Sequence, residues 1–278
     1  MTISCRDADG IPKVPGAGGI SSVGDQSIQV MHNGLQVKAG GYYGDWMAHI
    51  IRALQGHHEP QEELIFHQLL RYLRHGTTMV ELGCFWAYYS LWFLKEIPGS
   101  RAFCVEPDPK NLAVGRTNAG LNALSERVRF KQAWVGGEAN ASHRAATESA
   151  PEPTVLPMMN MSSVTAELAG APVELLHMDV QGYELQFLNS MRAAVEKKLL
   201  RFVMVSTHHS CISGSKTTHP DCVEALRQLG ASILIEHDVI ESFSGDGLIL
   251  ASFYAEDRGL KFPPISRNRA ETSLFKSA

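Results

Sequence analysis

The segment V-E-L-G-C-F-W-A-Y-Y-S, residues 80–90, joins a short apolar strand to a helix through a turn that contains Gly83. Glycine at this position lets a ligand approach the backbone, and the first amides of the next helix favour an anionic group. A dinucleotide fingerprint needs three glycines, whereas this turn holds Phe85 and Trp86. A pyrophosphate does not fit well against those rings, so the segment favours a smaller and less charged ligand.

Short apolar segments alternate with helical ones from residue 77 onward. The predicted strands are 78–82, 101–106, 128–135, 173–179, 201–206, 232–237 and 247–253, and the predicted helices lie near 87–96, 109–123, 181–197 and 220–229. This alternation predicts an α/β fold with a mostly parallel seven-stranded sheet and helices on both faces. Only residues 241–247 join the last two strands, which is too short for a parallel crossover. The last strand is therefore predicted to be antiparallel.

The chain is expected to have four parts: a flexible leader (1–27), an N-terminal extension (28–76), the α/β domain (77–255) and a tail (256–278). The leader is rich in Gly, Pro and Ser, and the tail is basic and contains prolines. Inside the α/β domain, residues 137–157 are polar without periodicity and are expected to form a loop.

The N-terminal extension contains three recognisable local signals. Asn33-Gly34 predicts a hairpin turn, and G-G-Y-Y-G at 40–44 predicts a flexible aromatic loop that, with the leader, is a candidate lid. A helix is predicted to begin at Pro60, with Glu62 and Glu63 placed to interact favourably with its dipole.

Composition narrows the classes of partner. A net charge of −4 over 278 residues gives no general attraction to nucleic acid or anionic lipid, so neither is expected as a partner. Five cysteines without C-x-x-C spacing favour reduced thiols, and Cys84 and Cys104 lie in apolar runs. Without a signal sequence or a membrane-length apolar run, a cytoplasmic protein without a membrane span is expected. The sequence does not specify an oligomeric state.

Acidic residues end two consecutive predicted strands. Glu81 lies at the end of the first, and Glu106 ends the second, just before Pro107 stops it. A carboxylate at the second position can accept hydrogen bonds from both hydroxyls of a ribose. Either residue alone is also explained as a solvated strand-end acid. Two of them on neighbouring strands favour a nucleoside site.

Asp179, His208 and His209 follow two further strands at the same predicted edge of the sheet. Asp179 can cap the next helix or contact a ligand, because it follows apolar residues and is costly to bury without a partner. A neutral imidazole can take a proton from an alcohol as the alcohol is alkylated. The two histidines project to opposite sides of an extended chain, so at most one is expected to be the base. A divalent metal held by these residues is compatible with their types but is not favoured, because the spacing matches no metal motif.

From Glu63 to Phe253 the sequence resembles the FkbM-type family of S-adenosylmethionine-dependent methyltransferases. The resemblance rests on residues 80–90, on C-V-E-P-D-P at 104–109 with the asparagines that follow, and on H-M-D-V-Q-G-Y-E-L-Q-F-L at 177–188. It implies a Rossmann-like class I methyltransferase fold, and S-adenosyl-L-methionine as the cofactor. The expected antiparallel last strand suits that fold.

The resemblance also implies roles for individual residues. Glu81 and Gly83 would border the methionine part of the cofactor, with Tyr89 and Ser90 lining the same turn. Glu106, beside Pro107, would hold the ribose. The positions expected to border adenine are Ala133 and Trp134. Asp179 would face the cofactor amine or the acceptor hydroxyl.

Three positions depart from the family pattern. Phe85 replaces the usual asparagine, Ala87 the second glycine, and Gln181 the glutamate after D-V. The leading prediction is an O-methyltransferase for a hydroxyl of a small molecule, such as a sugar, glycoside or natural product. A nicotinamide-dependent oxidoreductase, a nucleic-acid methyltransferase and a catalytically inactive cofactor-binding protein are the alternatives, each less favoured.

Overall fold

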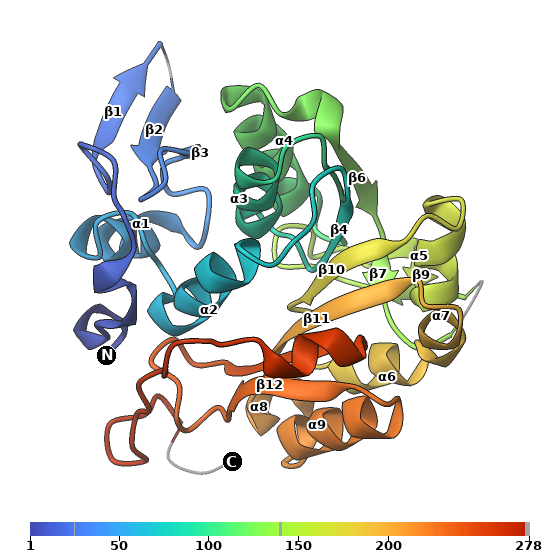
Figure 1. Cartoon of the computed structure of the whole chain (residues 1–278). Coiled ribbons are helices and arrows are strands. Elements are labelled where there is room, and N and C mark those ends of the chain that lie inside the picture. Colours follow the sequence, from blue (N-terminus) through green and yellow to red (C-terminus); the bar gives the residue numbers. More distant parts are fainter. Residues whose placement is uncertain (25, 139–140, 276–278) are drawn as a thin grey trace.

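The computed structural model describes residues 1–24, 26–138 and 141–275 (Figure 1). Its main sheet has the order β12-β13-β11-β10-β4-β5-β6. The bounds are β4 Thr78–Leu82, β5 Arg101–Glu106, β6 Val128–Gln132, β10 Val173–Met178, β11 Leu200–Thr207, β12 Ser232–His237 and β13 Gly247–Ser252. Strand β13 is antiparallel to both β11 and β12, while the pairs from β11 to β6 are parallel. The predicted sheet and its antiparallel last strand are confirmed.

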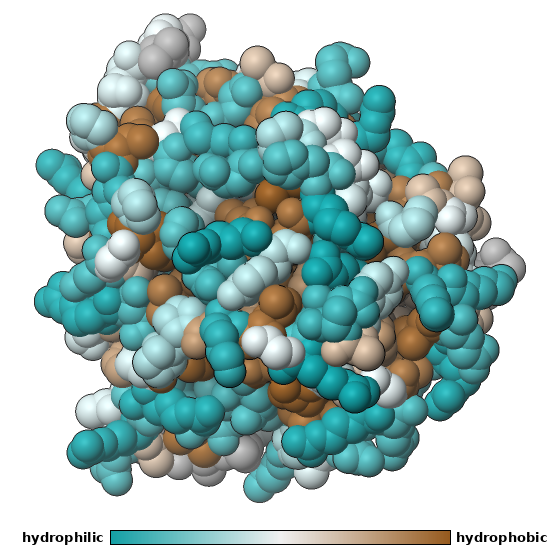
Figure 2. Space-filling model, viewed as in Figure 1, coloured by the Kyte–Doolittle hydropathy of each residue, from teal (hydrophilic) through white to brown (hydrophobic). Residues whose placement is uncertain are grey.

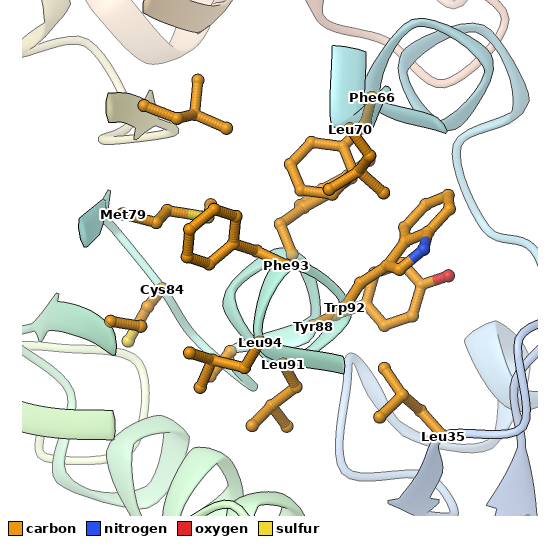
Figure 3. Close-up of a cluster of buried hydrophobic side chains, with 14 of the residues drawn as sticks. Leu35, Phe66, Leu70, Met79, Cys84, Tyr88, Leu91, Trp92, Phe93 and Leu94 are labelled. Carbon is orange, nitrogen blue, oxygen red and sulfur yellow. The ribbon is translucent and has the colours of Figure 1, made fainter. Parts of the chain in front are cut away.

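Two apolar clusters cover the two faces of this sheet. The first lies under α2 (Pro60–Leu70), α3 (Tyr88–Glu96) and α4 (Pro109–Leu121), and it includes Met79 and Leu175 from the strands. Figure 3 shows Tyr88 and Trp92 of α3 within this cluster, together with Phe66 of α2 and Leu35 of the N-terminal extension. The second lies under α5 (Met161–Glu167), α6 (Glu184–Asn189), α7 (Arg192–Glu196) and α9 (Thr218–Gln228). Helices therefore pack on both faces, as predicted.

Two of the element predictions were wrong in detail. The single helix predicted near 181–197 is the pair α6 and α7, with residues 190–191 between them. The first helix also begins later than predicted, because Gln181 (φ 54°) and Gly182 (φ 102°) adopt left-handed conformations. The strand predicted over 128–135 ends at Gln132, and the chain then leaves the main sheet. Residues Trp134–Val135 form β7, which pairs with β9 in a small separate sheet.

The predicted polar loop at 137–157 was also wrong. Strands β8 (Ser142–Ala145) and β9 (Thr154–Met159) pair there as an antiparallel hairpin. Half of its strand residues are exposed and Met159 alone among them is buried, so it lacks the buried apolar alternation from which a strand is recognised.

The N-terminal extension forms a small sheet beside the main domain (Figure 1). Strands β2 (Gln26–Val30) and β3 (Gln36–Lys38) form the predicted hairpin, and Gly34 in its turn has φ 81°. Helix α1 (Gly44–Ala53) follows. Residues expected to be a flexible leader instead include strand β1 (Ile20–Val23), paired with β2, and the buried side chains of Cys5, Ala8 and Ile11.

The tail also contacts the rest of the protein. The 3₁₀ helix η4 (Ala255–Gly259) is followed by a segment whose Ser266 carbonyl accepts a hydrogen bond from Gln61 Nε2 at 2.8 Å. On the face in Figure 2, the described hydrophobic residues form small areas separated by hydrophilic ones. Over the described residues, every helix is too short or too polar to cross a lipid bilayer.

Candidate active site

A cavity of about 340 Å³ lies at the carboxyl ends of β4, β5 and β10. Most of the expected site residues line it: Glu81, Gly83, Tyr89, Glu106, Pro107, Trp134 and Asp179. Ser90 and Ala133 lie behind the wall, and each has an exposed fraction of 0%. The described wall includes neither His208 nor His209, which line a different cavity of about 330 Å³.

Both the backbone conformation at residue 83 and its close packing against Asp179 require glycine. Its φ is +73°, and a Cβ atom on it would lie 1.6 Å from the carbonyl oxygen of Asp179. The same turn keeps left-handed conformations at Phe85 (φ 41°) and Ala87 (φ 61°), although neither is glycine. Both departures in this turn therefore hold left-handed conformations without glycine, and Phe85 lines the cavity.

Glu106 is held at the tip of β5 by the turn around it. Its two carboxylate oxygens accept hydrogen bonds from the amides of Phe85, at 3.0 Å, and Asp108, at 2.9 Å. Burial nevertheless raises the pKa of Glu106 to about 7. Each oxygen keeps a second lone pair for a ligand donor such as a hydroxyl.

Glu81 is fixed in a similar way by the start of α3. The amide of Ser90 donates to Glu81 Oε2 at 3.0 Å, so Ser90 holds this carboxylate although it does not line the cavity. Burial raises the pKa of Glu81 to about 7, although nearby His177 opposes this. Both strand-end acids therefore titrate near neutral pH and become fully ionised when a cation lies beside them.

Asp179 and His208 form an ion pair at the end of β10. His208 Nε2 lies 3.1 Å from Asp179 Oδ1, and its Nδ1 lies 2.7 Å from Glu184 Oε1. Burial alone disfavours the charged ring, but Asp246, Asp179 and Glu184 outweigh it and raise the pKa of His208 well above its usual value. A ring that stays protonated at neutral pH cannot accept a proton. This argues against His208 as the one of the two histidines that acts as base, and its contact with Asp179 is suited to holding that carboxylate in place.

His209 lies away from the cavity. Its ring stacks on Phe275 with 4.0 Å between centroids, and its Nδ1 accepts a hydrogen bond from the amide of Cys211. It caps the short helix α8 (Ser210–Ser213). The prediction that His208 and His209 project to opposite sides agrees with this arrangement, and His209 is not among the described residues that line the cofactor cavity.

Part of the wall was missed by the residue predictions. Tyr42 and Tyr43, from the aromatic loop proposed as a lid, line the cavity, and Tyr42 stacks on Trp86 with 4.6 Å between ring centroids. His58 and Glu59, just before α2, also line it. The glycines around Tyr42 and Tyr43 could have revealed these two residues from the sequence. His58 and Glu59 could not be recognised in this way, because polar residues before a helix look like ordinary capping residues.

His177 also lines the cavity and was not selected from the sequence. Its Nε2 lies 2.7 Å from Oε1 of Glu62, and Glu62 also accepts a hydrogen bond from Ser206 Oγ at 2.9 Å. Burial by itself lowers the pKa of His177, but the hydrogen bond to Glu62 raises it overall. Glu62, expected to interact with the helix dipole, is thus a buried partner of the cavity wall.

The charges around the cavity favour a cationic ligand. Its described acidic residues are Glu59, Glu81, Glu106, Asp108, Glu148 and Asp179, and none of the lining residues described is Lys or Arg. The pyrophosphate of a dinucleotide would therefore have no Lys or Arg to pair with among the described lining residues. S-adenosylmethionine carries a sulfonium and an ammonium group together with ribose hydroxyls, so the donors and charges of this wall fit it.

A mostly parallel sheet with a ligand cavity beyond the carboxyl ends of its strands defines a Rossmann-like cofactor-binding domain. The family model described as "Methyltransferase FkbM domain" matches residues 57–233, and the chain belongs to that family. The expected family, its fold and S-adenosylmethionine as its cofactor are therefore confirmed.

Solved structures offer only distant likenesses. An O-methyltransferase from Bacillus cereus in complex with SAH is 15% identical, with 69% of this chain and 78% of that one covered and a TM-score of 0.39. TrmK of M. capricolum in complex with S-adenosyl-homocysteine is 11% identical, with 67% and 66% covered and a TM-score of 0.43. A precorrin-6y C5,15-methyltransferase from Geobacter metallireducens is 13% identical, with 69% and 86% covered and a TM-score of 0.44. These likenesses do not bear on the substrate. No curated protein has a significant match to the sequence.

Proposed function

We propose that the protein transfers the methyl group of S-adenosylmethionine to a hydroxyl of a small molecule, such as a sugar, glycoside or natural product. The observation that carries this proposal is the acidic cavity at the strand ends, which has no Lys or Arg among its described lining residues. Its size falls in the range of sites for small ligands. Tyr42 and Tyr43 enclose it from the N-terminal side.

Within this proposal the strand-end acids hold the cofactor. Glu106 accepts the ribose hydroxyls with the lone pairs that its own turn leaves available. Glu81 and Asp179, which face the cavity from neighbouring strands, bind the positively charged methionine part. Trp134 and Pro107 border the adenine. Ser90 and Ala133 act from behind the wall, Ser90 through the amide that positions Glu81.

The acceptor hydroxyl is oriented by Asp179. When bound, S-adenosylmethionine supplies an electrophilic methyl group on a sulfonium. The hydroxyl proton becomes strongly acidic as the new oxygen–carbon bond forms, so a carboxylate of low pKa is a sufficient proton acceptor. Although burial raises the pKa of Asp179, hydrogen bonding to His208 lowers it overall, so Asp179 is ionised. His208 fixes the carboxylate and keeps it ready to receive the hydroxyl proton.

Two measurements test the proposal. S-adenosylhomocysteine should raise the melting temperature of the protein, whereas NADH should not, because the described lining residues include no Lys or Arg to pair with a pyrophosphate. Transfer of a labelled methyl group to a panel of sugars, glycosides and phenols should then identify a hydroxyl acceptor. A shift with NADH alone would favour an oxidoreductase. Cofactor binding without transfer to any hydroxyl, amine or carbon acceptor would favour an inactive binding protein.

A further inference from the structure

A second polar cluster lies outside the cavity, where the N-terminal extension meets α2. It consists of His32, just after β2, His57, in the loop before α2, and Glu63, in the first turn of α2. Their exposed fractions are 2%, 1% and 0%, and none of them lines the cofactor cavity. One possible ligand atom from each lies within 4.8 Å of the others. Two imidazoles and a carboxylate thus converge on one buried point.

The carboxylate of Glu63 is oriented by the backbone. Its Oε1 accepts hydrogen bonds from the amides of His58, at 2.7 Å, and Glu59, at 3.3 Å. Its Oε2 therefore faces the cluster, where it contacts His57 Nδ1 and accepts a hydrogen bond from the Tyr88 hydroxyl at 3.2 Å. Burial opposes ionisation, but the neighbouring histidines His57 and His58 lower the pKa of Glu63 well below its usual value.

The ring of His32 presents a lone pair to this carboxylate. Its Nδ1 lies 3.3 Å from the carbonyl oxygen of Pro12, which can only accept, so Nδ1 carries the hydrogen. With the hydrogen on Nδ1, the neutral ring leaves Nε2 as an acceptor. That Nε2 has no hydrogen-bond partner among the described residues and lies 3.9 Å from Glu63 Oε2. Two acceptors that face each other in a buried place are unfavourable unless a cation lies between them.

His57 completes the arrangement. Its ring stacks on that of His32 with 4.1 Å between centroids, and its Nδ1 contacts the same carboxylate oxygen. The other ring nitrogen, Nε2, has no partner within the described part of the chain. A purely hydrogen-bonded cluster thus leaves one nitrogen on each ring unsatisfied, although both rings are almost fully buried.

We propose that His32, His57 and Glu63 bind a divalent transition-metal ion, with Zn²⁺ as the best match to the donor set. Imidazole nitrogens and a carboxylate oxygen are ligands that zinc prefers, whereas Mg²⁺ and Ca²⁺ favour all-oxygen sites. The surroundings have the outer contacts typical of metal ligands. The N–H at Nδ1 of His32 donates a hydrogen bond to the Pro12 carbonyl, and the carboxylate of Glu63 accepts one from the amide of His58. A water molecule would supply the fourth position, as is common for zinc with three protein ligands.

Such an ion would stabilise one wall of the cavity without taking part in catalysis. It would join the hairpin of the N-terminal extension, through His32, to the beginning of α2, through His57 and Glu63. The next two residues along the chain, His58 and Glu59, line the cavity. Metal binding is therefore expected to change stability and to have its main effect on cofactor affinity through that wall. The site is independent of which acceptor is methylated.

The first test uses the unmodified protein. After treatment with a chelator and dialysis, titration with Zn²⁺ should reach one ion per chain, and a hundredfold excess over the Kd should raise the melting temperature by about 5 °C or more. Titration with Co²⁺ should give the visible absorption of an ion with nitrogen ligands. Less than a tenth of an ion per chain together with an unchanged melting temperature would overturn the proposal and leave a hydrogen-bonded cluster.

Variants locate the ion. Glu63→Gln and His32→Gln should each weaken Zn²⁺ binding by at least about tenfold, because each loses a ligand. His67→Gln is the matched control, since His67 lies on the same helix but outside the cluster, and it should bind Zn²⁺ as the parent does. Equal binding by all three variants would place the ion elsewhere and refute the assignment. If a variant does not fold, the cobalt spectrum of the parent protein still decides whether nitrogen ligands are present.

Discussion

Gly83 at the end of β4 packs directly on the carbonyl oxygen of Asp179 at the end of β10. A Cβ atom at residue 83 would lie 1.6 Å from that oxygen, and φ of +73° adds strain for any other residue. This contact keeps the tips of two neighbouring strands close together. It thereby fixes the spacing between the turn that follows Gly83 and the carboxylate of Asp179.

Gly83→Ala should therefore destabilise the protein strongly. We expect a loss of at least about 3 kcal/mol in the free energy of unfolding, because the overlap is with backbone and cannot be relieved by a rotamer change. Gly76→Ala is the control: its φ is +70°, but nothing lies within 4 Å of the added atom. That variant should lose only about 1 kcal/mol from backbone strain. Urea denaturation of both variants measures the difference in their free energies of unfolding. Equal losses would show that backbone strain alone, without the contact to Asp179, explains the need for glycine at residue 83.

Cofactor affinity should depend on pH through Glu81 and Glu106. Burial raises the pKa of each to about 7, so both are partly protonated at pH 6 and largely ionised at pH 8. A cationic ligand binds better to the ionised form. The affinity for S-adenosylmethionine should therefore rise as pH increases from about 6 to 8, with release of protons on binding.

Calorimetry in buffers of different ionisation enthalpy measures this proton release at pH 7. Glu81→Gln removes one titrating group and should reduce the number of protons released. Affinity that falls with increasing pH, or uptake of protons, would contradict binding of S-adenosylmethionine by the ionised forms of these two acids.

The two adjacent histidines should behave differently when replaced. His208→Gln removes the buried partner of Asp179 and should lower kcat by at least about tenfold, with a smaller change in the affinity for S-adenosylhomocysteine. His209→Gln should keep at least half of the parent activity, because that ring stacks on Phe275 away from the cavity. Asp179→Asn should lose about a hundredfold in turnover. If His209→Gln were the inactive variant, the assignment of Asp179 as proton acceptor would be wrong.

The main sheet was predictable because its strands are continuous apolar runs. Residues 78–82 and 101–106 were predicted with the bounds that the structure has, since burial on both faces of a parallel sheet imposes that pattern. The hairpin of β8 and β9 was missed because half of its strand residues are exposed and Met159 alone among them is buried. The late start of α6 was missed because alternation in hydrophobicity does not reveal a left-handed Gln181.

The strand-end site was predicted in outline and the buried histidine cluster was not. Glu81, Glu106 and Asp179 each follow an apolar strand, so their positions reveal a common edge. His32, His57 and Glu63 come from segments that packing alone brings together, and no spacing rule connects them. Glu63 illustrates the difficulty. An acid in the first turn of a helix is expected to be exposed, and here it is completely buried beneath the N-terminal extension.

Tyr42 should control how tightly the cavity closes. Its ring stacks on Trp86 at an interplanar angle of 6° and meets the edge of Phe85 with 4.9 Å between centroids. Tyr42→Ala removes both contacts and opens the wall, so the Kd for S-adenosylhomocysteine should rise by about tenfold, equivalent to about 1.4 kcal/mol. Tyr42→Phe keeps the ring and should leave the Kd within about twofold of the parent value. Isothermal titration of both variants makes the comparison, with far-UV circular dichroism to check that each is folded. Equal affinity in Tyr42→Ala and the parent would mean that the aromatic loop does not close over the cofactor.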